Sequence, residues 1–460
     1  MTRADVSFRG AYALFVLVGL LTASGAQPSD RARVPAAPPQ TTSSPNGFRY
    51  TGPGSCSAPS CHGGVQPRQK CRVWQNEYGT WAVQDKHSRA YRALTTPVSQ
   101  RMGRILGIPQ PESASKCLAC HSLNISQEQR CRSFDSSDGV SCECCHGPAE
   151  VWLGLHTTQE WCELTAKQKA DKGMYDTKDL ISRSERCLTC HLGNKEKFVD
   201  HEMIAAGHPD LYFELDSFSA VMPRHWPEPL GADRCRNPVL TDRPLCSPWI
   251  SAQSWGTGQA VQLREDLNRL TERTKGKIWP EYSELDCFAC HHSLTDAKDS
   301  WRQKRGYPGR QPGNPPWNMS CYVVFRQLAG EVDTEPSRHL EAGMNQLFTQ
   351  MSQLMNNRDA IASTAQSSAD LTKQLAARIK ETQFDAALTL RLLRSISADS
   401  IYIAGQGERA AEQAAMAIDS LFIAYTQNAS VGNAQQVRDP SAYNQYTFEE
   451  KMRTVNALLQ

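Results

Sequence analysis

The sequence predicts a mainly α-helical protein in which a loop-rich region with short helices precedes a C-terminal helical bundle. Between Tyr50 and about Ser300, Cys, His, Trp and turn residues are dense, and regular apolar patterns are short. Beyond Cys321, apolar residues recur at the 3.6-residue spacing of an α-helix. A chain of 460 residues is also too long for one compact core, so we expect two or three domains.

Composition excludes two broad classes of protein. The chain has 50 Lys and Arg against 48 Asp and Glu, a net charge of +2, whereas nucleic-acid binders normally carry a basic excess. Hydrophobic residues make up 40% of the sequence, which argues against a polytopic membrane protein. We therefore expect no nucleic-acid partner.

Residues 1–26 have the pattern of a secretory signal peptide. Arg3 and Arg9 precede an apolar run at residues 11–23, and small residues at 24–26 offer a cleavage site. An uncleaved N-terminal anchor is the alternative. The pattern predicts a periplasmic or otherwise exported protein that does not span the membrane after signal cleavage.

The remaining chain divides by composition. Residues 27–49 are rich in Pro, Ser and Thr and predict a flexible linker. We expect residues 50–304 to form a cysteine-rich domain and the Pro- and Gly-rich residues 305–320 to form a connector, in which the stretch from Arg305 to Trp317 cannot be helical. Residues 321–460 form the helical domain.

Apolar spacing predicts the helices of that last domain. One helical face runs from Leu340 to Met355, and further helices are indicated over residues 371–379, 384–396 and 411–425. Met344, Met351 and Met355 follow one stripe. This stripe could supply a metal ligand, but at helical spacing Met is usually core. The helices could also dock a partner or form an oligomer.

The cysteines and histidines form a repeated motif. The chain has 17 Cys and 12 His, and the pattern C-x-x-C-H, which marks attachment of c-type haem, occurs four times. Two thiols bond the haem vinyl groups, and the adjacent histidine reaches the iron. A variant with four intervening residues, C-x-x-x-x-C-H, begins at Cys56. The five motifs predict five covalent haems c, attached through Cys56, Cys61, Cys117, Cys120, Cys142, Cys145, Cys187, Cys190, Cys287 and Cys290, with His62, His121, His146, His191 and His291 as iron ligands.

Zinc or disulfide sites are the alternative interpretation of these motifs. Zinc motifs seldom place a histidine directly after the second cysteine, because that histidine would have to fold back onto the same metal. Seven cysteines remain outside the motifs: Cys71, Cys131, Cys144, Cys162, Cys235, Cys246 and Cys321. Cys235 and Cys246 bracket a short loop and are the most plausible disulfide. Cys144 is expected to be a packed thiol.

Seven histidines remain as possible second axial ligands. A second axial histidine makes a haem six-coordinate, which suits electron transfer, whereas an open position allows a substrate to bind. We expect distal ligands among His87, His156, His201, His208 and His225. His292 directly follows a proximal ligand and could serve only a neighbouring haem. His339 belongs to the helical domain and is expected at the surface.

Three stretches resemble the cytochrome c-554 family of multihaem c-type cytochromes. They are Gly139-Val-Ser-Cys-Glu-Cys-Cys-His-Gly-Pro-Ala, His87-Ser-Arg-Ala-Tyr after Trp81, and His201-Glu-Met-Ile-Ala-Ala-Gly-His-Pro. The resemblance covers about Tyr50 to His292. It implies closely stacked haems with mostly bis-histidine ligation, with His87, His156 and His208 in distal positions. The chain with its C-x-x-x-x-C-H motif at Cys56 and its helical C-terminal region resembles larger, exported planctomycete-type members of this family.

Two functions follow from these observations. The first is a periplasmic pentahaem cytochrome that carries single electrons between redox partner proteins, with no catalytic residues. The second is a reductase of a small nitrogen oxyanion or similar substrate, which would need one open haem. Pentahaem nitrite reductases carry a Cys-x-x-Cys-Lys motif, and this chain has none. Electron transfer is therefore favoured over catalysis.

Overall fold

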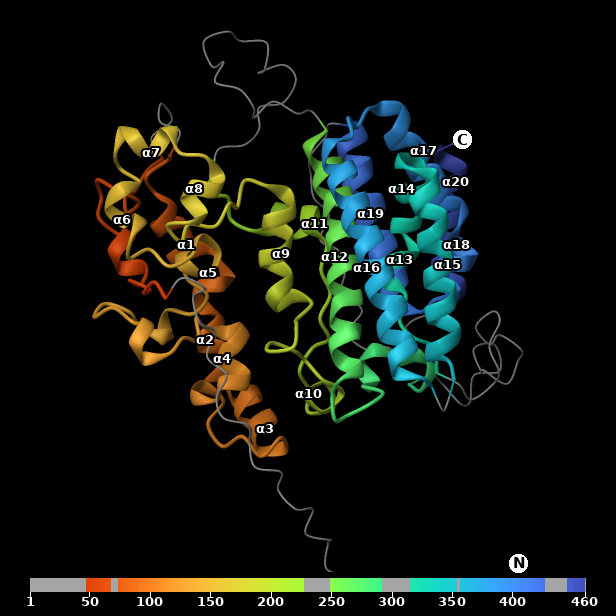
Figure 1. Ribbon diagram of the computed structural model, residues 1–460, viewed down its shortest axis with the longest axis horizontal. Helices are drawn as coiled ribbons and strands as arrows, with labels where there is room; N and C mark the ends of the chain where they lie inside the picture. Colours follow the sequence, from red (N-terminus) through yellow and green to blue (C-terminus); the bar gives the residue numbers. More distant parts are fainter. Residues whose placement is uncertain are drawn as a thin grey trace, which may run out of the picture. The chain divides into compact units, whose positions relative to one another are not determined.

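The structure is a computed structural model that describes residues 47–67, 73–226, 249–291, 315–353, 356–426 and 445–459. These residues all lie in the unit that spans 39–460. They form helices and loops without strands, apart from isolated bridges of Tyr50 with Arg130 and of Leu285 with Trp317. The predicted mainly α-helical fold class is confirmed (Figure 1). The predicted signal peptide lies outside the described residues, as do most of the predicted linker and connector.

The first part of the described chain consists of short helices joined by loops. Their bounds are η1 (Pro53–Cys56), α1 (Glu77–Gln84), η2 (Lys86–Arg89), α2 (Ala90–Leu94), α3 (Pro97–Ile105), η3 (Pro111–Ser113), α4 (Ser115–His121), η4 (Gln127–Gln129), η5 (Ser136–Asp138), α5 (Cys142–His146), α6 (Trp152–Leu155), α7 (Gln159–Glu163), α8 (Ala166–Ala170), α9 (Leu180–His191), α10 (His201–Ala205) and α11 (Leu215–Val221). Side-chain caps start several of them: Asp179 accepts from the Ser182 amide at α9, and Asp200 from the Met203 amide at α10.

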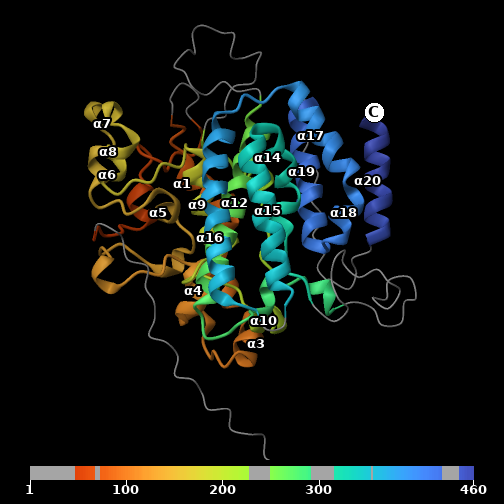
Figure 2. The same cartoon turned by 45° about the vertical axis from the view of Figure 1, so that its right-hand side comes forward.

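Longer helices follow. They are α12 (Ile250–Thr274), α13 (Ser320–Val323), α14 (Phe325–Val332), α15 (Thr334–Met351), α16 (Arg358–Glu381), α17 (Ala386–Ala398), α18 (Ser400–Gly405), α19 (Glu408–Thr426) and α20 (Gln445–Leu459), with η7 (Tyr282–Glu284) and η8 (Cys287–Ala289) between α12 and α13. The four helices expected from apolar spacing correspond to α15, α16, α17 and α19. α14, α15 and α16 lie together in Figure 2, and α14 and α16 both pack on α15.

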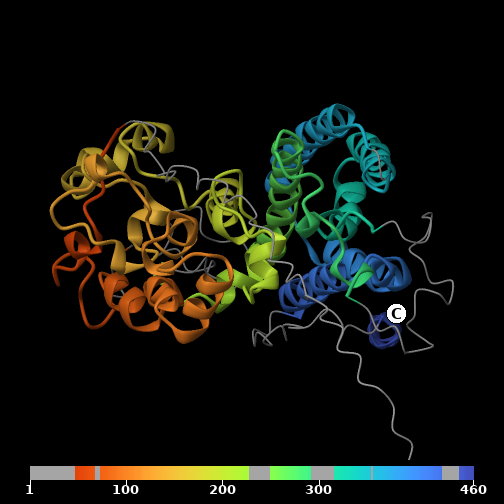
Figure 3. The same cartoon turned by 90° about the horizontal axis from the view of Figure 1, so that it is seen from below.

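Helix α12 is the main feature that the sequence pattern does not indicate. It runs for 25 residues between the fourth and fifth motifs and packs along α16, as Figure 3 shows in a view along the long helices. A one-sided apolar stripe is absent because α12 is buried on nearly all sides, including at Thr257, Gln259 and Gln262. Gly256 and Gly258 allow close approach, since a Cβ on Gly258 would lie 2.6 Å from Leu215 Cβ.

The apolar core is distributed unevenly along the chain. One large buried cluster extends from Leu180 to Met452 and includes residues of α12 and of α13 to α20. The motif-rich residues before Leu180 have a separate small cluster of Ala149, Trp152 and Trp161. This part therefore buries few apolar side chains of its own, which is what we expect where haem groups supply the apolar interior. The predicted domain division at residues 305–320 stays a prediction, although α12 shares a core with the C-terminal helices.

Candidate haem-binding site

Four of the five motifs lie on a helical turn. Those ending at His121, His146 and His191 lie on α4, α5 and the last turns of α9, and Cys287 begins η8. The longer first motif begins at the last residue of η1, and its extra residues form a turn held by amides of Cys61 and Gly63 that donate to the Ala58 carbonyl. A helical turn brings both thiols and the histidine to the same side of the backbone.

The structure brings every motif histidine opposite one of the five candidate distal histidines. The ring centres are 6.2 to 6.5 Å apart in all cases. The pairs, each motif histidine first, are His62 with His156, His191 with His87, His121 with His208, His146 with His225, and His291 with His201. The pairing itself could not be predicted from the sequence.

The separation of the paired rings fits a haem iron between them. An imidazole nitrogen binds a metal at about 2 Å, and the ring centre lies about 1.1 Å behind it, so two axial imidazoles have centres roughly 6 Å apart. Direct hydrogen bonding between the rings would need a shorter separation. Because the two cysteines of each motif directly precede one ring of the pair in the sequence, the residues present fit five haems c.

Hydrogen bonds orient several of these rings through Nδ1. His62 Nδ1 lies 2.9 Å from Glu77 Oε2, and His87 Nδ1 lies 3.0 Å from Asp85 Oδ1. Backbone carbonyls take the same position at four other rings: that of Ala90 for His121, Leu153 for His156, Pro209 for His208 and Pro223 for His225. A proton fixed on Nδ1 leaves Nε2 as the lone-pair donor, as an iron ligand requires.

The paired histidines fall into two groups according to the direction in which their pKa is shifted. Burial lowers the pKa of His146 to about 4, and it also lowers the pKa of His191, His208 and His225. These imidazoles are therefore neutral at pH 7, which is the metal-binding form. The neighbouring carboxylates of Glu77 and Asp85 instead raise the pKa of His62 and His87. A carboxylate partner makes an imidazole a stronger electron donor to a metal.

Thiols of different motifs also meet. The Cys56 and Cys142 thiols lie close enough to influence each other's pKa, and so do those of Cys120 and Cys190. The first and third motifs are therefore neighbours, and so are the second and fourth. His201 and His208 lie at either end of the short segment that contains α10, so the pairs at the second and fifth motifs share one stretch of chain.

Glu143 is a structural residue that the sequence analysis did not single out. It lies inside the third motif and is 1% exposed. Its carboxylate accepts three backbone N–H groups, from Thr51 (2.9 Å), Gly52 (2.7 Å) and Ala149 (2.7 Å). Burial raises its pKa, and these three N–H groups act in the opposite direction. Glu143 thus ties the start of the described chain to the third motif. Its position as an acidic residue between the two cysteines of a motif is the sequence feature that could have indicated this role.

The cysteines outside the motifs have varied surroundings. Cys131, Cys144, Cys162 and Cys321 are free thiols, while Cys71, Cys235 and Cys246 lie outside the described residues, so the expected disulfide stays a prediction. Burial raises the pKa of Cys144 to about 12, so it is a neutral packed thiol.

Other ligand candidates lie in the helical part or outside the described chain. His339 is exposed on α15, and Met344 and Met351 belong to the large core. His292 and Met355 are outside the described residues.

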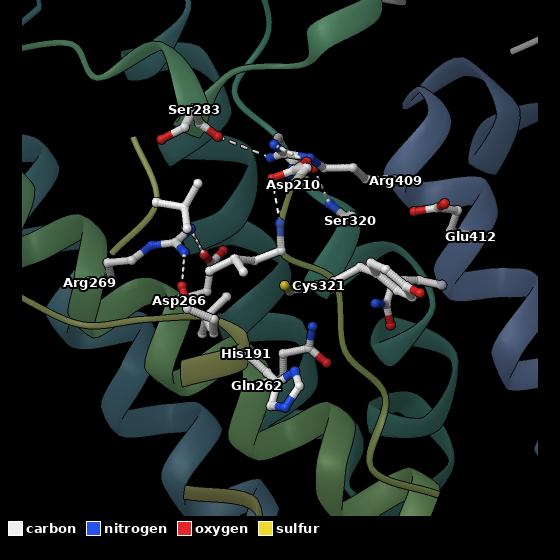
Figure 4. Close-up of a pocket in the computed structure, with 16 residues that line it drawn as sticks. His191, Asp210, Gln262, Asp266, Arg269, Ser283, Ser320, Cys321, Arg409 and Glu412 are labelled. Atoms are coloured by element: carbon white, nitrogen blue, oxygen red, sulfur yellow. Dashed lines mark hydrogen bonds and ion pairs between the residues drawn. The ribbon is translucent and has the colours of Figure 1, made fainter. Parts of the chain in front are cut away.

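A small polar cavity of about 40 Å³ lies beside His191 (Figure 4). Arg269 donates to Asp266 (2.6 Å) and Glu284 (3.0 Å) at its wall, and Arg409 donates to the Ser283 carbonyl (3.0 Å). Cavities that bind substrates are usually some ten times larger. This one has room for one or two water molecules.

The motifs and the facing histidines define a class, that of c-type cytochromes. Residues 56–147 match the family described as cytochrome c554 and c-prime, which supports an assignment of this segment to a cytochrome c554-type family. The resemblance inferred from the sequence is confirmed. Proteins of this family hold haem c covalently, exchange electrons with redox partners and are typically exported. Comparisons with curated proteins and with solved structures give no match. Among the described helices, none is long and apolar enough to cross a membrane.

Proposed function

We propose that the protein is an exported, periplasmic pentahaem cytochrome that carries single electrons between redox partner proteins through five bis-histidine haems. The observation that carries this proposal is the presence of a second histidine, at 6.2 to 6.5 Å between ring centres, opposite each of the five motif histidines. Two imidazoles on every iron leave no open position for a substrate, which favours electron transfer over the reductase alternative.

The residues divide the work of holding the haem groups. The ten motif cysteines would bond the porphyrins, and the ten paired histidines would ligate the irons. When bound, haem c supplies reversible one-electron chemistry at iron. Glu77 and Asp85 hold the rings of His62 and His87 with their donor nitrogens free, and they add negative charge that stabilises a ferric iron. Thiol contacts between motifs favour close spacing of the attached groups.

Mass spectrometry of the mature protein tests the haem count, because each covalent haem adds a fixed mass. We expect five haems in the parent protein and four in the double variant Cys56→Ala/Cys61→Ala. The double variant Cys131→Ala/Cys162→Ala removes two cysteines outside the motifs and is the matched control, with five haems expected. Four haems in the parent protein would contradict attachment at the first motif.

Electron paramagnetic resonance of the oxidised protein tests the ligation. Five bis-histidine haems are all low-spin, so we expect no substantial high-spin ferric signal and no spectral change on adding nitrite. A high-spin signal that accounts for one haem in five, and that shifts when such a molecule is added, would favour the reductase.

A further inference from the structure

We infer that the exposed surface of η2, α2 and α3 is a docking surface for an acidic one-electron redox protein. This inference rests on the proposed electron-transfer function and names the chemistry of one partner. We call this surface the basic face and define it by five cations and two apolar residues: Lys86, Arg89, Arg92, Arg101, Arg104, Val98 and Ile105.

The charge of the basic face is locally unbalanced. Residues 86–111 contain five Lys and Arg and no Asp or Glu, although the whole chain has nearly equal numbers of both signs. All five cations are exposed, and none of them forms an ion pair with another residue in the described part of the chain. The acidic residues on either side of this segment bind other side chains: Asp85 is buried and lies 3.0 Å from His87 Nδ1, and Glu112 accepts a hydrogen bond from Gln100. Asp135 caps η5 and Asp138 ends it, and η5 packs against α2.

The apolar residues give this face the composition of a protein interface. Val98 and Ile105 are 65% and 59% exposed. Val98, Arg101 and Ile105 follow one side of α3 at spacings of three and four residues, and Arg104 lies beside them. Apolar side chains surrounded by Arg are typical of interface patches, in which Arg is enriched and Lys is depleted.

The basic face also lies directly over two haem sites. His87, on η2 together with Lys86 and Arg89, faces His191, and the Ala90 carbonyl of α2 accepts from His121 Nδ1 at 2.9 Å. On α3, the Met102 side chain would lie 3.8 Å from a Cβ placed on Gly207, the neighbour of His208. A partner bound here would therefore be separated from the irons of the His191/His87 and His121/His208 pairs by little more than one layer of helix.

Reduction by an acidic donor tests the docking surface. The probe is reduced plant-type ferredoxin, whose [2Fe–2S] cluster gives up one electron as one ferric haem becomes ferrous. In stopped-flow mixing, we expect the second-order rate constant to fall about tenfold between 10 and 300 mM ionic strength. The variant Arg92→Gln/Arg101→Gln/Arg104→Gln should be about tenfold slower at low salt and almost independent of salt.

The matched control removes the same charge elsewhere. Lys373→Gln/Lys451→Gln/Arg453→Gln changes three exposed cations on α16 and α20, and it should stay within about twofold of the parent protein. Reduced methyl viologen, a small cation that needs no docking, should reduce all three proteins equally at 300 mM ionic strength, where charge is screened.

Haem count and low-spin spectra of the same samples separate this inference from the proposed function. If the protein carries five low-spin haems but the basic-face variant reacts with ferredoxin as the parent does, only the docking surface is wrong. Binding of the parent, and not of the basic-face variant, to phosphatidylglycerol vesicles, with unchanged ferredoxin rates, would also overturn it in favour of a lipid surface.

Discussion

The contacts of His208 predict the effect of replacing it. Its Nδ1 lies 2.7 Å from the Pro209 carbonyl, and its ring centre lies 6.3 Å from that of His121. His208→Ala should convert one haem to high-spin without loss of covalent haem, because attachment needs only the cysteines and the proximal histidine. The potential of that haem should rise, since a strong donor to ferric iron is lost. Optical and magnetic spectra and a redox titration measure these effects.

The exposed His339 provides the control for that substitution. His339→Ala should leave every haem signal unchanged. If the His208→Ala protein had the same spectra as the parent, the assignment of His208 as an iron ligand would be wrong.

Glu77 should tune a haem potential without binding the iron. Its carboxylate holds His62 Nδ1 at 2.9 Å and makes this ring a stronger donor. Glu77→Gln keeps the size of the side chain and removes the charge, so one potential should rise by tens of millivolts while all haems stay low-spin. Glu163→Gln changes an exposed carboxylate on α7, removes the same charge away from these rings and should have little effect. Equal shifts in the two variants would mean that charge alone, and not the hydrogen bond, sets the potential.

At the scale of elements, Gly258 sets how closely α12 approaches α11. A Cβ at this position would lie 2.6 Å from the Leu215 Cβ, an atom fixed to the backbone of α11. Gly258→Ala should lower the free energy of unfolding by about 1–3 kcal/mol, measured by urea denaturation. Gly330→Ala is the control, because a Cβ there meets no atom within 4 Å, and it should be neutral or stabilising by up to about 1 kcal/mol. Similar effects at both glycines would rule out the packing explanation.

The N-terminus of α19 should make stability depend on pH. Burial, together with Glu412 and Asp286, raises the pKa of Glu408 to about 7, while Arg409 acts in the opposite direction. A carboxyl group with a raised pKa binds its proton more tightly in the folded state, so its contribution to stability is full below the ordinary pKa of 4.5 and is lost as pH rises through 7.

Glu408→Gln should therefore flatten the pH profile of stability. Compared with the parent, the variant should lose about 1–2 kcal/mol less unfolding free energy between pH 5 and pH 8, allowing for partial solvation of the carboxylate. The exposed Glu381→Gln should follow the parent at both values. A parent-like slope in Glu408→Gln would show that Glu408 is already ionised at pH 5.

For the whole molecule, the sequence predicts features that depend on neighbouring residues, and it does not predict contacts between residues that are far apart in the chain. Motif spacing identifies cysteines and histidines that share a helical turn, and apolar spacing identifies helices with one buried side, such as α15. The pairing of His62 with His156 could not be predicted in this way, because the position of His156 in the sequence does not indicate which motif histidine it faces. Helix α12 was missed for a related reason: Gln259 and Gln262 are buried among other helices, where no water-facing side imposes a period.

Each facing pair of histidines closes a loop of chain. The partners lie roughly 80 to 100 residues apart in sequence, and successive loops overlap, since the segment from His87 to His191 begins inside the one from His62 to His156. With metal bound between the partners, these loops become interleaved crosslinks that restrict the unfolded chain as disulfides do, at up to several kcal/mol for a loop of this length. The region with few buried apolar side chains would then be stabilised largely because the crosslinks lower the conformational entropy of its unfolded state. Loss of one distal histidine–iron bond would also destabilise segments far from that iron.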